Sequence, residues 1–223
     1  MNPNRAYELL QKLQTLCPMR RRKLRVFQQD FQVWSAIDLD LLMENLAQLS
    51  DDHPDVIDER LPYWAEIWPS ARVLAEAILT QTPPENPCWL ELGCGPGLAG
   101  LAASSRGCRG IWTDYMPEAL QLAELNAITA NVPDIQTRIL DWRSPPDDLQ
   151  VGWILASDVA YENRNFVPLM DCFETLLTPK GEVWLGEPGR DIAKEFFQIL
   201  SASGWHHQCL LRVGDVRVHR LHR

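Results

Sequence analysis

The sequence predicts an α/β protein with a Rossmann-like, doubly wound sheet. Strand-like and helix-like segments alternate from about residue 88 onward, a glycine-rich turn follows the first of these strands, and two β-prone runs surround Gly214-Asp215. Alternating strands and helices are typical of parallel sheets, and a Gly-Asp pair between β-prone runs is typical of a hairpin. We therefore expect a seven-stranded sheet of five parallel strands and a C-terminal antiparallel hairpin.

The first 60 residues are expected to form a mostly helical N-terminal extension, and residues 61–223 the main domain. Apolar side chains recur at helical spacing over 3–16 and 38–49, which predicts two amphipathic helices. Weaker alternation over 23–34 indicates a short hairpin.

In the main domain a helix is expected to begin at Pro69, because proline is tolerated in the first turn. Short apolar runs then predict five parallel strands at 88–92, 110–114, 137–142, 153–158 and 182–187. Helices are expected between and after them at about 98–106, 117–130, 165–177 and 190–203. The terminal hairpin should pair 206–213 with 216–222.

Charge and length narrow the classes of function. The chain has 223 residues and a formal net charge of −9, which argues against a broad nucleic-acid surface, since such surfaces carry clustered Lys and Arg. The basic run at 20–25 is expected to be a solvated face.

The sequence also bears on compartment and metal binding. No apolar run approaches the ~18 residues of a membrane span, and no secretory signal is evident at the N-terminus. The six cysteines form no C-x-x-C pair, so free thiols in a reducing cytoplasm are expected, and neither disulfides nor a metal site.

The most informative segment is the glycine turn at 93–97, which follows the strand at 88–92. Glycines at 93, 95 and 97 allow a sharp turn and close approach to a ligand, although a turn of this kind can also simply join a strand to a helix. Two residues argue against a dinucleotide. Leu98 occupies the place of the third glycine of the G-x-G-x-x-G fingerprint, and Glu91 puts negative charge where a pyrophosphate would lie.

Each of the five parallel strands carries an acid at or near its carboxyl end: Glu91, Asp114, Asp141, Asp158 and Glu187. Ligands of open α/β sheets bind at this edge. Asp114 ends the second strand, where an acid can accept hydrogen bonds from both ribose hydroxyls; its alternative role is a helix N-cap. Asp141 and Trp142 are placed to bracket an adenine; the alternative role of Trp142 is a core residue.

These positions imply a ligand with an adenosine group, free ribose hydroxyls, no phosphate and an ammonium-bearing tail near Glu91. S-adenosyl-L-methionine meets all of these requirements. Its positively charged sulfonium also suits an acid-rich site.

Three motifs then resemble those of a known family. Glu91-Leu92-Gly93-Cys94-Gly95-Pro96-Gly97 resembles the first motif of the seven-β-strand class I methyltransferases, and Ser157-Asp158-Val159-Ala160-Tyr161 resembles the D-x-x-Y motif of their protein-lysine branch. The segments 62–69 and 187–190 look most like those of the electron transfer flavoprotein β-subunit lysine methyltransferases and their bacterial relatives. The resemblance covers roughly residues 61 to 190.

The resemblance implies specific roles for several residues. The cofactor contacts it implies are Trp68, Gly93, Cys94, Gly95, Asp114, Trp142 and Ser157. It places Asp158 and Tyr161 where the methyl group and its acceptor meet. The alternative roles are a helix N-cap for Asp158 and a packing residue for Tyr161.

The function this implies is methylation of a lysine amine on a protein substrate. Two alternatives stay open: a small-molecule N-methyltransferase with the same cofactor, and a non-catalytic S-adenosylmethionine-binding protein. Methylation of a nucleic-acid base is not expected, because the fourth strand does not end in an N-P-P-Y type motif and the chain is acidic.

Overall fold

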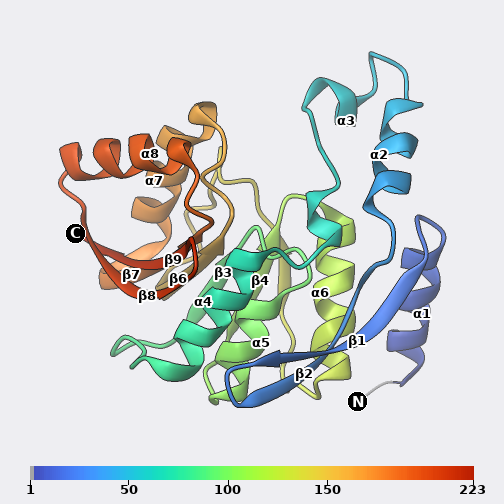
Figure 1. Ribbon diagram of the computed structural model, residues 1–223, viewed down its shortest axis with the longest axis horizontal. Coiled ribbons are helices and arrows are strands. Elements are labelled where there is room, and N and C mark those ends of the chain that lie inside the picture. The colour runs from blue at the N-terminus through green and yellow to red at the C-terminus, as the bar shows by residue number, and fades with distance from the viewer. Residues whose placement is uncertain (1–2) are drawn as a thin grey trace.

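A seven-stranded sheet forms the centre of the molecule in the computed structural model, which describes residues 3–223 (Figure 1). Its strands are β3 (Trp89–Leu92), β4 (Gly110–Asp114), β5 (Thr137–Ile139), β6 (Val151–Ser157), β7 (Leu177–Glu187), β8 (His206–Val213) and β9 (Val216–His222). Their order is β5-β4-β3-β6-β7-β9-β8. Strands β3 to β7 are parallel, and β9 runs antiparallel to both of its neighbours. The predicted fold class is confirmed.

Helices cover both faces of the sheet. They are α4 (Pro69–Thr80), α5 (Leu98–Ser105), α6 (Pro117–Thr129), α7 (Phe166–Leu176) and α8 (Asp191–Ala202), with short 3-10 turns η1 (Tyr63–Ala65) and η2 (Asn163–Asn165). One buried cluster joins α4, α5 and α6 to the sheet, and a second joins α7 and α8 to its other face. Chain order along the sheet changes direction at β3, which pairs with both β4 and β6, and this is where ligands of such sheets bind.

Tryptophan pairs fill the core beneath α4 and α5. Trp89 and Trp112 meet edge to face with ring centroids 4.8 Å apart, and Trp153 and Trp184 meet at the same distance. Helix α5 comes close to the first pair because it is made of small residues: a Cβ at Gly100 would lie only 2.3 Å from Nε1 of Trp112. The bulky strand residues therefore require a small-residue helix above them.

The N-terminal extension contains α1 (Pro3–Gln14), β1 (Met19–Val26), β2 (Gln29–Ala36), α2 (Leu39–Ala47) and α3 (Pro54–Ile57). Helix α1 packs against α6, where Arg5 and Glu124 form a 2.7 Å ion pair. The hairpin is longer than the predicted 23–34, because charged side chains on the outer face of β1 hide its alternation.

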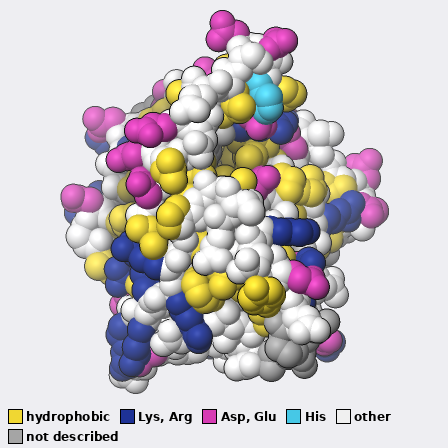
Figure 2. Space-filling view, turned by 90° about the vertical axis from the view of Figure 1, so that its right-hand side faces the viewer, with side chains coloured by type: hydrophobic (Ala, Val, Ile, Leu, Met, Phe, Trp, Pro, Cys, Tyr) yellow, Lys and Arg dark blue, Asp and Glu magenta, His cyan; other side chains and the backbone are white. Residues whose placement is uncertain are grey.

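Helices α2 and α3 rise above the carboxyl ends of the sheet strands, while the hairpin lies at the opposite end (Figure 1). Figure 2 shows this side of the molecule with acidic side chains at the projecting top and basic ones toward the lower left. Across residues 3–223, no helix has the length and apolarity needed to cross a membrane.

One predicted strand is shorter than expected. The segment 137–142 was predicted to be extended throughout, but β5 ends at Ile139. Asp141 accepts a 2.9 Å hydrogen bond from the main-chain N–H of Arg143, and the chain turns there. A short polar side chain has thus favoured a turn over continuation of the strand.

Candidate active site

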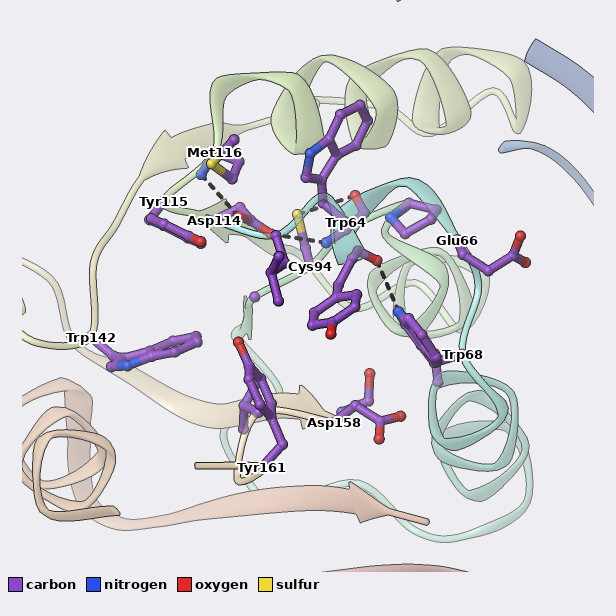
Figure 3. Close-up of a pocket in the computed structure, with 18 of the residues that line it drawn as sticks. Trp64, Glu66, Trp68, Cys94, Asp114, Tyr115, Met116, Trp142, Asp158 and Tyr161 are labelled. Atoms are coloured by element: carbon purple, nitrogen blue, oxygen red, sulfur yellow. Dashed lines mark hydrogen bonds between the residues drawn. The ribbon is translucent and has the colours of Figure 1, made fainter. Parts of the chain in front are cut away.

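A cavity of about 340 Å³ opens at the carboxyl ends of the parallel strands (Figure 3). The turns and loops after β3, β4, β5 and β6 line it on one side, and the segment 61–71 before and at the start of α4 lines it on the other. A cavity of this size, with apolar walls and a few converging polar groups, is typical of a small-molecule site.

Asp114 holds the glycine turn in place. Asp114 ends β4 and has 5% of its surface exposed. Its carboxylate accepts a 3.0 Å hydrogen bond from the Gly95 N–H and a second one from the Met116 N–H. Gly95 has φ +48°, and a Cβ there would lie 3.1 Å from the Trp64 carbonyl oxygen. Bare backbone is therefore required at this wall of the cavity.

Glu91 does not face the cavity. Strand alternation points it toward α5, where its carboxylate accepts hydrogen bonds from the N–H groups of Gly100 at 2.8 Å and Ala99 at 3.3 Å. Burial raises the pKa of Glu91 to about 8. The expected contact between Glu91 and a ligand ammonium is thus replaced by a structural role, because the carboxylate already partners the amides of the first turn of α5.

Trp142 lines the end of the cavity near β5. Its ring lies 6.4 Å from that of Tyr115, the residue after Asp114. Asp141 lies beside this end in a smaller adjoining cavity, where Arg143 donates to both of its carboxylate oxygens. Burial acts to raise the pKa of Asp141, but the hydrogen bonds from Arg143 outweigh it and hold the pKa below its ordinary value.

Asp158 is the most unusual side chain of the site. It follows β6 with φ +55°, held by a 3.0 Å hydrogen bond from its N–H to the Gly186 carbonyl. Its side chain is 10% exposed, and neither carboxylate oxygen has a hydrogen-bonding partner among the described residues. Burial raises the pKa of Asp158, and the nearby Ser70 hydroxyl and the Arg190 guanidinium, 3.8 Å away, only partly offset this.

Three aromatic side chains gather around Asp158. Tyr63 meets Trp68 edge to face at 5.6 Å and Tyr161 at 6.2 Å, and the Trp68 indole N–H donates a 2.9 Å hydrogen bond to the Tyr63 carbonyl. Figure 3 shows Tyr161, Asp158 and Trp68 on the side of the cavity away from Asp114, with Trp142 at one end. Burial raises the pKa of Tyr161 to about 12, so its phenol stays protonated at neutral pH.

Most of the residues singled out from the sequence line this one cavity: Trp68, Gly93, Cys94, Gly95, Asp114, Trp142, Ser157, Asp158 and Tyr161. Glu91 and Asp141 do not. Sequence reasoning missed Tyr115, Met116 and Arg190 as lining residues. Tyr115 and Met116 directly follow Asp114, the acid that ends β4. Their position just after a strand end could have identified them as lining residues.

The residues present fit S-adenosylmethionine. Asp114 keeps lone pairs that can accept from ribose hydroxyls, and the backbone of Gly93 and Gly95 leaves room for close approach. Asp158 is a buried carboxylate with no hydrogen-bonding partner in the described chain, so it suits a cavity that receives positive charge.

The sheet order, glycine turn and acid-lined cavity define a doubly wound α/β protein whose site suits a ligand with hydroxyl groups and positive charge. A family model described as "Lysine methyltransferase" matches residues 63–203. The chain therefore belongs to the lysine methyltransferase family.

Two curated relatives are similar over part of their length. The ribosomal protein L11 methyltransferase of Hydrogenovibrio crunogenus is 31% identical over 100 residues, which is 44% of this chain and 34% of the relative. The protein-lysine N-methyltransferase rrg1 of Schizosaccharomyces pombe is 28% identical over 145 residues, or 56% of this chain and 48% of the relative. The matched region thus spans about a third to a half of these relatives.

Solved structures share the fold. The ribosomal protein L11 methylase of Lactobacillus delbrueckii subsp. bulgaricus superposes with a TM-score of 0.58 at 20% identity, covering 69% of this chain and 78% of that one. The 16S rRNA N2 G1207 methyltransferase RsmC of Thermus thermophilus, in complex with AdoMet and guanosine, gives 0.57 at 14% identity, covering 91% and 44%. Their different substrates show that the fold does not fix the acceptor.

Proposed function

We propose that this chain is an S-adenosylmethionine-dependent N-methyltransferase that methylates a lysine amine of a protein substrate. The observation that carries the proposal is Asp158, a buried carboxylate with no hydrogen-bonding partner among the described residues, at the aromatic side of the cavity. Membership of the lysine methyltransferase family and the similarity to protein-directed methyltransferases support it.

The cofactor would be held at the glycine turn. Asp114 would accept from the ribose hydroxyls, the main chain of Gly93 to Gly95 would line the adjoining wall, and Trp142 would offer a ring face to the adenine. Ser157 and Trp68 complete the wall toward Asp158. When bound, the cofactor supplies an electrophilic methyl group on a positively charged sulfonium.

The acceptor would enter beside Asp158. A carboxylate here can bind an ammonium by a charge-assisted hydrogen bond, and Tyr63 and Tyr161 form aromatic walls suited to a cation. A lysine amine, with an ordinary pKa of about 10.4, must lose a proton before it can attack. Asp158 orients the amine in this scheme, and water carries the proton away.

The compartment proposed is the cytoplasm. All six cysteines are free thiols. Cys17, Cys94 and Cys172 are buried, and no pair of cysteines forms a disulfide in the described part of the chain. Free thiols are typical of proteins kept in a reducing compartment.

The test is incubation of the protein with methyl-labelled S-adenosylmethionine and a lysate of the source organism, beside the variant Asp158→Asn. We expect label in a protein band, in lysine on hydrolysis, and its loss in the variant with cofactor affinity unchanged by calorimetry. Label only in small molecules would favour a small-molecule N-methyltransferase. Tight cofactor binding without any transfer would favour a non-catalytic role.

A further inference from the structure

Three consecutive residues of the N-terminal extension reach across the cavity edge of the sheet. Asp58 pairs with Arg143 after β5, Glu59 with Arg164 in η2 after β6, and Arg60 lies over the ring of Tyr115 after β4. We refer to Asp58, Glu59 and Arg60 as the strap. Each of its side chains contacts the segment that follows a different strand.

The strongest contact of the strap is bidentate. Arg143 donates to both carboxylate oxygens of Asp58, at 2.5 Å from Nη1 and 2.9 Å from Nη2, across 85 positions of sequence. The hydrogen bonds from Arg143 lower the pKa of Asp58 to about 2. Isolated surface ion pairs contribute little, but bidentate pairs within a network are the exception.

The guanidinium of Arg143 also forms an ion pair with Asp141. Its Nη2 lies 2.6 Å from Oδ2 of Asp141, so one arginine joins the strap to the acid that follows β5. Asp58 thereby fixes the position of Arg143, and Arg143 fixes that of Asp141. Asp58 therefore acts on Asp141 chiefly through Arg143, which contacts both carboxylates.

Two residues of the strap, Asp58 and Glu59, border a space beside the main cavity. An adjoining cavity of about 130 Å³ is lined by Asp58, Glu59, Arg143 and Arg164, and it shares Tyr115, Trp142 and Tyr161 with the main one. Glu59 adopts φ +51°, a left-handed conformation that costs free energy in a residue other than glycine. Its carboxylate forms a 2.6 Å ion pair with Arg164, and its main-chain N–H donates a 3.1 Å hydrogen bond to the Val56 carbonyl.

We propose that the strap is part of the cofactor site and retains the adenosine end of the bound cofactor behind Trp142 and Tyr115. Asp58 is a positioning residue, and Arg60 braces Tyr115. This inference rests on the proposed cofactor. The strap lies before residue 63, where the match to the family model begins.

The test measures release of S-adenosylhomocysteine by stopped-flow tryptophan fluorescence, since Trp142 lines the cavity. We expect Asp58→Asn to speed release about twofold to fivefold, as for loss of a partly exposed charged pair. Salt should speed release from the wild-type protein, because screening weakens these pairs, and should affect Asp58→Asn less. The matched control is Asp51→Asn, an exposed acid of the same extension that should leave release unchanged.

Two further measurements separate positioning from general stability. Asp58→Asn should speed release much less in an Arg143→Gln background than in the wild-type protein, because the contact that the two residues share is already lost and only the 3.1 Å pair of Asp58 with Arg60 remains. In the wild-type protein, ligand should slow amide hydrogen exchange over residues 55–61, a readout that needs no variant. The proposed role of the strap would be overturned if Asp58→Asn released the ligand as slowly as Asp51→Asn. It would also be overturned if ligand left amide exchange over residues 55–61 unchanged. Failure of the wild-type protein to bind the ligand at all would instead overturn the proposed function.

Discussion

The main-chain N–H of Gly95 donates a 3.0 Å hydrogen bond to Oδ2 of Asp114, which joins the turn after β3 to the end of β4. The other oxygen of that carboxylate accepts from the N–H of Met116 at the start of α6. One buried side chain therefore sets the shape of two walls of the cavity. It also keeps lone pairs available for a ligand.

Asp114→Ala should weaken cofactor affinity by roughly 1–3 kcal/mol, the scale of a lost hydrogen-bonding partner at a buried site. Calorimetry with S-adenosylhomocysteine measures this directly. Asp147→Ala removes an exposed acid on the loop after β5 and should bind as the wild-type protein does. Equal affinities for the two variants would rule out the ribose role of Asp114.

Cofactor affinity should fall as the pH drops below about 6, because burial raises the pKa of Asp114 to about 6 and hydroxyls donate best to the ionised carboxylate. The opposite sign applies to the ligand-free protein. A carboxyl whose pKa is raised on folding binds its proton more tightly when folded, so Asp114 adds stability as the pH falls from about 6 toward 4. Titrations between pH 5 and 8 test the first statement, with Asp114→Asn expected to give a flatter profile.

Tyr161→Phe should keep most of the transfer rate, whereas Tyr161→Ala should lose roughly a hundredfold. The phenylalanine ring preserves the edge-to-face contact with Tyr63, at 6.2 Å in the wild-type protein, and removes only the hydroxyl. Loss of the ring removes both the aromatic contact and the wall beside Asp158. Single-turnover rates at saturating cofactor measure this, and equal losses in the two variants would assign the role to the hydroxyl instead.

Gly100→Ala should destabilise the fold by about 1–3 kcal/mol or more, as overpacked core substitutions do. The added methyl would lie 2.3 Å from the Trp112 indole nitrogen and 2.8 Å from the Trp89 ring. Urea unfolding gives the free energy. Ser104→Ala, on a half-buried position of the same helix, should be neutral or slightly stabilising.

The part of the site that follows from sheet topology could be predicted from sequence. Parallel strands present their carboxyl ends at one edge, so Asp114, Trp142 and Asp158 could be brought together without knowing any contact between them. The direction of Glu91 was the exception. In the structure Leu90 and Leu92 face the α7 side of the sheet and Trp89 faces the α5 side. Because side chains alternate along a strand, Glu91 lies on the same side as Trp89, under α5, and this alternation could have been used to predict it.

What could not be predicted depends on side-chain contacts across long sequence separations. Arg143 carries no motif, and its partner Asp58 lies 85 positions earlier in a segment without a recognisable pattern. The lining role of Arg190 likewise depends on how the turn after β7 is held, where Glu187 accepts a 2.6 Å hydrogen bond from the Gly189 N–H.

The left-handed backbone at Asp158 limits how this protein can change during evolution. At φ +55° asparagine, aspartate and glycine are the residues best tolerated, so most substitutions there are penalised by conformation before their chemistry is tested. The carboxylate is thus a fixed point around which other positions can vary. A changed acceptor range, natural or engineered, should arise through Tyr63, Tyr161 and Arg190, whose side chains surround Asp158 on ordinary backbone.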